Sequence, residues 1–143
     1  LPETPDLVLI LVNASRVADM LRQCGEKGVP YVIIFSSGFS EVGGGGVGLQ
    51  RQLADIAREF DIGVVGPNCQ GMINVADGVF AGFGSVFHTD YEPGVVSMVS
   101  QSGGFGFSRC FWEVSSSPHH HCRWWPRSTL PRRDARSPPC PSR

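Results

Sequence analysis

The chain has 143 residues, 41% of them hydrophobic, and a formal net charge of −1 at pH 7. That length suits one average domain or parts of two, and the balanced charge argues against a nucleic-acid-binding or membrane-surface protein. The charge is unevenly spread, since residues 1–108 carry 5 basic and 11 acidic side chains whereas residues 109–143 carry 7 basic and 2 acidic ones. All 18 glycines lie at or before Gly106, so the two segments differ in composition as well.

Membrane, secretion and metal signals are weak. No apolar run approaches the roughly 18 residues that a membrane-spanning helix needs. The run DLVLILV at residues 6–12 is short and has no basic leader, so we expect no signal peptide. The five cysteines form no CxxC pair, which indicates neither a disulfide framework nor a zinc site. We expect a cytoplasmic protein with no metal site and no nucleic-acid or membrane partner.

The first predicted element is a buried parallel strand at residues 6–12, because a continuous apolar run is typical of a strand covered on both faces. A helix is expected from about Ser15, and YVIIF at residues 31–35 predicts the next strand. A second helix is predicted over residues 48–60 and a third strand over residues 62–65. The apolar stripe of the first helix consists of Val17, Met20, Leu21 and Cys24.

Strands that alternate with helices in this way predict βαβ units and therefore an α/β fold with a parallel sheet. Ligands of such sheets bind beyond the carboxyl ends of the strands. Three loops are predicted at that edge, namely NAS after Val12, SSGFSE after Phe35 and GPNCQGMIN after Val65. The GGGG run at residues 43–46 lacks the Lys-Ser/Thr of a phosphate-binding P-loop and is interpreted as a flexible linker.

The second half of the chain starts a new unit. EPG at residues 92–94 is interpreted as a short linker, after which VVSMVS predicts a strand and QSGGFG the start of a helix. The N–H groups and positive dipole end of such a helix suit phosphate.

Simpler readings of these loops stay open. Ser100 or Ser102 can act as an ordinary helix N-cap, and Asn68 can satisfy only its own turn. An α/β-hydrolase with Ser102 as nucleophile is a weaker alternative, because SQSGG approximates the G-x-S-x-G elbow. A hydrolase of this kind needs a histidine that follows the nucleophile in the chain. Within residues 1–108 the only histidine is His88, which precedes Ser102.

In this order, SSGFSE, LQRQL, IGVVGPNCQGMIN and GVVSMVSQSGGFG closely resemble the nucleoside-diphosphate-forming acyl-CoA synthetases. This family includes ADP-forming acetate–CoA ligases and the alpha subunit of succinyl-CoA synthetase. The resemblance covers roughly residues 6–108. It implies a Rossmann-like CoA-binding domain at residues 1–91, truncated at its N-terminal side. Residues 92–108 would then form a linker and the first strand of a flavodoxin-like ligase domain.

The resemblance also implies site residues. Cys69 is read as a small wall residue beside the CoA thiol rather than a nucleophile, since no histidine lies near it in sequence. The SQSGG turn at residues 100–104 would bind the phosphohistidine of the family reaction. The implied CoA-binding residues are Ser36, Ser37, Gly38, Asn68, Cys69, Gly71 and Asn74, with Val12 and Asn13 as looser candidates. The implied phosphate-binding residues are Ser100, Gln101, Ser102, Gly103 and Gly104.

The family reaction converts acyl-CoA and phosphate into acyl phosphate and CoA, after which the phosphoryl group passes to a histidine and then to ADP. The last transfer takes place on an ATP-grasp domain or beta subunit, where ATP, ADP and Mg bind. The chain matches neither that histidine nor the ATP-grasp domain, so we expect a fragment that binds CoA and acyl-CoA without turnover, and no catalytic residue is assigned. Alternatives are a CoA-binding module without catalysis and a fragment of a CoA-binding/acetyltransferase fusion.

Residues 109–143 do not continue the family pattern. They contain no glycine and crowd Arg, Pro, Ser, Cys, Trp and His together, which is typical of GC-rich codons read out of frame. We interpret them as an aberrant, disordered tail. Metal binding by residues 119–122 and phosphate binding by PRRDAR are alternatives that we do not favour.

Overall fold

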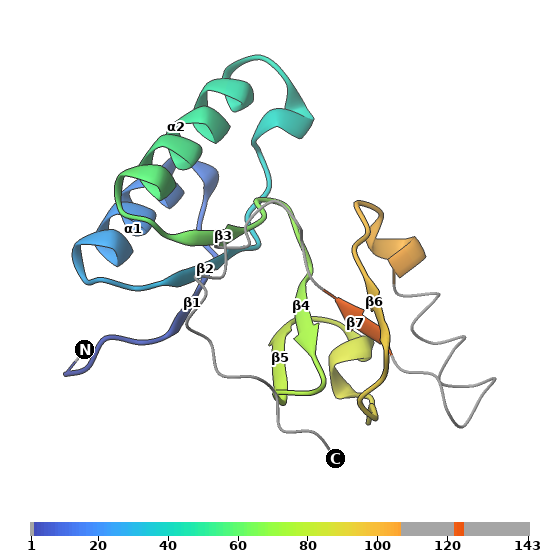
Figure 1. The fold of residues 1–143 in the computed structure, drawn as a ribbon. Helices are drawn as coiled ribbons and strands as arrows, with labels where there is room; N and C mark the ends of the chain where they lie inside the picture. Colours follow the sequence, from blue (N-terminus) through green and yellow to red (C-terminus); the bar gives the residue numbers. More distant parts are fainter. Residues whose placement is uncertain (1, 107–121, 125–143) are drawn as a thin grey trace.

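The computed structural model describes residues 2–106 and 122–124 (Figure 1). Its first part alternates strands and helices. The three strands pair in parallel in the order β1-β2-β3, which confirms the predicted parallel α/β fold. The elements are β1 (Leu7–Ile10), α1 (Ala14–Glu26), β2 (Tyr31–Ile34), the 3-10 helix η1 (Ser40–Val42), α2 (Gly45–Glu59) and β3 (Gly63–Val65).

Both α-helices lie on the same side of the sheet (Figure 1), as right-handed crossovers between sequential strands require. Side chains from this face and from the helices form the main apolar core. Phe39, which follows the second strand, is also fully buried in it. The core includes Ile10, Val17, Leu21, Val32, Ile34, Phe39, Leu53 and Ile56.

The opposite face of β1 is partly open. Leu9 is 43% exposed and Leu11 is 65% exposed. A cavity of about 260 Å³ lies farther along this face, between the sheet and the hairpin that follows it, lined by Ile33 and Met72 among others. The expectation that residues 6–12 are covered on both faces is therefore wrong within the described residues.

Helix α2 begins three residues earlier than predicted, so Gly45 and Gly46 belong to its first turn and not to a linker. Gly46 is buried, and a Cβ atom on it would lie only 2.0 Å from the carbonyl oxygen of Phe39. The glycine run therefore allows the helix to start tight against the SSGFSE loop. Gly43 and Gly44, both with positive φ, make the turn that precedes it.

The second part of the chain has its own small core. The antiparallel hairpin of β4 (Gly71–Asn74) and β5 (Val79–Gly82) is followed by η2 (Ser85–His88) and β6 (Val96–Met98). This core is built from Ile73, Val75 and Val86, with Phe87, Tyr91 and Met98 packed against it.

The small core contains residues from both sides of the predicted domain boundary at residues 91–92, because Met98 packs against residues that precede it. The boundary itself stays a prediction. The strand predicted in VVSMVS is confirmed. Strand β6 pairs in parallel with β7 (Cys122–Trp124), which falls in the segment predicted to be disordered. All other residues from 109 to 143 lie outside the described part of the chain. Within residues 2–106 and 122–124, no helix is long and apolar enough to cross a membrane.

Candidate functional site

The three predicted loops meet at the carboxyl ends of β1, β2 and β3. Ser36 Oγ donates a hydrogen bond to the carbonyl oxygen of Val12 at 2.5 Å, which ties the second loop to the first. The backbone N–H of Asn68 donates to the carbonyl oxygen of Ser36 at 3.0 Å, which ties the third loop to the second. Asn68 adopts a left-handed conformation with a φ of 54° and is exposed. The predicted convergence of these loops is present in the structure.

Cys69 lies in the third loop and is half-buried. Its thiol is 3.4 Å from the carbonyl oxygen of Ile34, to which it donates a hydrogen bond. Burial raises the pKa of the Cys69 thiol, although backbone hydrogen bonds oppose this effect. A neutral thiol is a poor nucleophile, and the role of Cys69 as a wall residue beside the CoA thiol stays a prediction.

Glu41 shapes the SSGFSE loop, although it was not among the predicted site residues. Its carboxylate accepts hydrogen bonds from the backbone N–H groups of Gly38 at 2.5 Å and Phe39 at 3.1 Å. The bond from Gly38 is the main reason that the pKa of Glu41 is lowered. Gly38 itself has a φ of 103°, a region that strongly favours glycine. The signal for this role in the sequence is the spacing of Gly38 and Glu41 in GFSE, which does not by itself distinguish a loop-fixing carboxylate from an exposed one.

Three predicted residues have evident structural roles. The side chain of Asn13 accepts hydrogen bonds from the N–H and hydroxyl of Ser15 and so caps α1. The side-chain amide of Asn74 donates a hydrogen bond to the carboxylate of Asp77 and accepts one from its N–H. Both residues lie in the hairpin turn, at the end of β4 away from the converging loops. Gly71 is buried where a Cβ atom would lie 2.1 Å from the carbonyl oxygen of Ala81. Their roles toward a ligand stay predictions, as does that of Ser37, which is exposed.

The SQSGG turn adopts the capped form. Ser102 Oγ accepts from the N–H of Phe105 at 3.3 Å, and Ser100 Oγ accepts from the N–H of Ser102 at 3.1 Å. The helical turn observed here spans residues 103–106. Among the described residues, no histidine is hydrogen-bonded to Ser102, so the hydrolase alternative gains no support from the geometry. Phosphate binding by residues 100–104 stays a prediction.

The described residues contain no group of three or more His, Cys, Asp and Glu side chains that could hold a metal ion. The histidines at positions 119–121, considered as metal ligands above, lie outside the described part of the chain.

Comparison with known proteins decides the family. The sequence profile of the family described as "CoA binding domain" matches residues 1–74, which is more than half of the chain. The chain belongs to this CoA-binding family. Among curated proteins, it is 37% identical over 114 residues to the alpha subunit of ADP-forming acetate–CoA ligase I from Pyrococcus furiosus. It is 38% identical over 112 residues to ADP-forming acetate–CoA ligase I from Archaeoglobus fulgidus.

These matches cover 80% and 78% of the chain but only 24% and 16% of the two relatives, so this member of the CoA-binding family spans at most about a quarter of their length. Solved structures agree. A Pyrococcus horikoshii protein superposes with a TM-score of 0.75 at 33% identity, over 87% of the chain and 27% of that protein. An acetyl-coenzyme A synthetase from Ca. Korarchaeum cryptofilum, solved with phosphate and ADP, gives 0.74 at 28% identity, over 87% of the chain and 26% of the synthetase. The resemblance to acyl-CoA synthetases and the Rossmann-like fold are confirmed.

Proposed function

We propose that the chain binds coenzyme A through the loops at the carboxyl ends of β1, β2 and β3, as part of an ADP-forming acid–CoA ligase. The observation that supports this proposal is that hydrogen bonds join the three loops to one another. The Ser36 hydroxyl bonds to Val12, and the Asn68 N–H bonds to Ser36, within a domain of the CoA-binding family. In parallel α/β sheets this edge is where ligands bind.

The chemistry of the edge suits a thiol-bearing ligand. Cys69 presents a small, neutral thiol because burial raises its pKa, so it adds no negative charge beside an incoming thiolate. Gly38 leaves its turn without a side chain at this edge of the sheet, and Glu41 fixes that turn. Residues 100–104 would contribute a phosphate site through their backbone N–H groups.

In the complete ligase, phosphate would attack the acyl carbon of acyl-CoA. A carbon–oxygen bond to phosphate forms, the carbon–sulfur bond breaks, and CoA leaves with the electron pair. The phosphoryl group then passes to a histidine and to ADP on an ATP-grasp domain or beta subunit, both supplied from outside the described residues. This chain would bind CoA and hold the acyl thioester, and a cytoplasmic location follows as a prediction from that metabolic role.

Isothermal titration calorimetry of the purified chain with CoA tests the proposal. We expect heat that saturates at micromolar CoA. Replacement Ser36→Ala removes the bond between the first two loops, worth about 1 kcal/mol, and should weaken CoA binding roughly fivefold. Ser85→Ala, on the hairpin side of the molecule, is the matched control and should leave the affinity unchanged.

Absence of saturable heat at millimolar CoA, from a chain that is folded by circular dichroism, would contradict the proposed function. A module without catalysis and a CoA-binding/acetyltransferase fusion share the CoA site and differ in what the complete gene encodes beside it. Reading the flanking gene in its correct frame separates a synthetase fragment from such a fusion, and sequencing the DNA around the codon for Ser108 tests whether residues 109–143 are read out of frame.

A further inference from the structure

A residue absent from the predicted site reaches from one predicted ligand loop to another. Gln70 follows Cys69 directly in the GPNCQGMIN loop, and its side chain lies against Gly103 in the SQSGG turn. A Cβ atom built on Gly103 would lie 2.6 Å from Oε1 of Gln70 and 2.9 Å from its Cδ. The three atoms nearest to that Cβ position all belong to the amide end of Gln70, so a side chain at position 103 would displace the amide from where it now lies.

The backbone of Gln70 is held on both sides. Its carbonyl oxygen accepts a hydrogen bond from the N–H of Phe83 at 3.3 Å, beyond the end of β5. The thiol of the preceding Cys69 bonds to Ile34 in the central strand of the sheet. The side chain of Gln70 therefore projects from a backbone that hydrogen bonds hold to the hairpin and to the sheet.

Gln70 as a residue is half-buried, and its side-chain amide has no hydrogen-bonding partner within the part of the chain that the structure describes. An amide offers one acceptor oxygen and two donor hydrogens. Leaving such a group unpaired beside a ligand costs about 1–3 kcal/mol, whereas pairing it with a ligand group avoids that cost.

The acyl group of an acyl-CoA must lie between these loops if the proposed function holds. Its sulfur would sit beside Cys69, and the attacking phosphate would sit at residues 100–104. We propose that Gln70 is a specificity-determining residue that contacts the acyl group and favours acyl groups bearing a hydrogen-bonding substituent over hydrocarbon groups of the same size. This inference rests on the proposed CoA site.

The test compares two acyl thioesters that differ only in a hydroxyl for a methyl, 3-hydroxypropanoyl-CoA and butanoyl-CoA, by calorimetry with the full chain. We expect the wild type to bind the hydroxylated thioester about tenfold more tightly. Gln70→Leu should remove that preference while changing the affinity for free CoA less than twofold. Gln52→Leu, an exposed glutamine on α2, is the matched control and should retain the preference.

Gln70→Glu provides a second variant with an acceptor oxygen in the same place. It should keep the preference for the hydroxylated thioester and weaken binding of malonyl-CoA, whose carboxylate would face the new charge. A preference that is absent from the wild type, or that survives in Gln70→Leu, overturns the inference while CoA binding still stands. Failure of the folded wild type to bind CoA overturns the proposed function and this inference together.

Discussion

Glu41 is the residue whose charge most directly fixes a candidate ligand loop. Its carboxylate accepts from the N–H groups of Gly38 and Phe39, and these bonds lower its pKa. Because the lowered pKa belongs to the folded state, the resulting stability is present above the unfolded pKa of about 4.3 and is lost as pH falls through the folded pKa. We expect Glu41→Gln to lose stability at pH 7 and to show a flatter decline below pH 4.5. Urea midpoints across pH 3–7 measure this, and identical pH slopes for both proteins would contradict it.

Cys69 should react slowly with alkylating reagents. Burial raises its pKa, so less of the reactive thiolate is present at neutral pH than in an exposed cysteine. We expect alkylation by iodoacetamide at pH 7.5 to be roughly threefold or more slower than that of free cysteine. Because burial raises the pKa of Cys69 in the folded state, the stability linked to its neutral thiol is complete below the unfolded pKa of about 8.5 and is lost as pH rises through the folded pKa.

Peptide mass spectrometry follows the modification, with Cys69→Ser to identify the signal. Alkylation as fast as that of free cysteine would show that the thiol is not shielded. CoA should slow the reaction further if the thiol of CoA lies beside Cys69, as proposed above.

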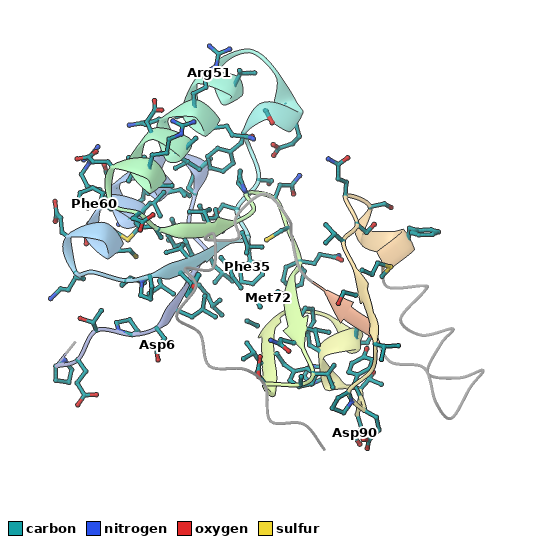
Figure 2. The ribbon with its side chains drawn as sticks, in the orientation of Figure 1. Asp6, Phe35, Arg51, Phe60, Met72 and Asp90 are labelled. Atoms are coloured by element: carbon teal, nitrogen blue, oxygen red, sulfur yellow. The ribbon has the colours of Figure 1, made fainter. Side chains whose placement is uncertain are left out.

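At the scale of single elements, the crossing of α1 and α2 depends on Gly25. Figure 2 shows Phe60 where the ends of the two helices come together, and a Cβ atom on Gly25 would lie 2.3 Å from Cγ of Phe60. Arg22 also stacks over this ring and pairs with Glu59 at 3.1 Å. Gly25→Ala gains up to about 1 kcal/mol in helix propensity but overpacks the crossing by about 1–3 kcal/mol, so we expect net destabilisation.

Gly48→Ala is the matched control, because Gly48 lies in α2 with open space around it. It should gain about 0.5–1 kcal/mol in the free energy of unfolding, measured by urea denaturation. Equal stability of the two variants would mean that the helices move apart at no cost.

The elements themselves were largely predictable. Apolar runs located all three parallel strands, because strands in such a sheet must bury continuous hydrophobic stretches. The start of α2 was not predictable, since glycine disfavours helices and the compensating contact of Gly46 with Phe39 is tertiary. The same limit applies to the site. Motif spacing found the loops, but the approach of Gln70 to Gly103 joins residues 33 positions apart and leaves no local signal in the sequence.

At the scale of the whole molecule, two separate apolar cores predict two levels of stability. Leu21 belongs to the core under the helices, and Ile73 belongs to the small core of the hairpin. We expect Ile73→Ala to cost about 2 kcal/mol and to speed hydrogen exchange in β4 and β5 while leaving β1 to β3 unchanged. Leu21→Ala should speed exchange in the parallel sheet. Uniform acceleration in both variants, measured by exchange mass spectrometry, would show that the cores unfold together.

The side of the sheet that faces away from α1 and α2 carries Leu9, Leu11 and Tyr31 in contact with solvent. An exposed hydrophobic surface of this kind binds fluorescent dyes such as ANS even when the protein is folded. Melting curves recorded with such dyes will therefore start from a bright baseline and understate the transition.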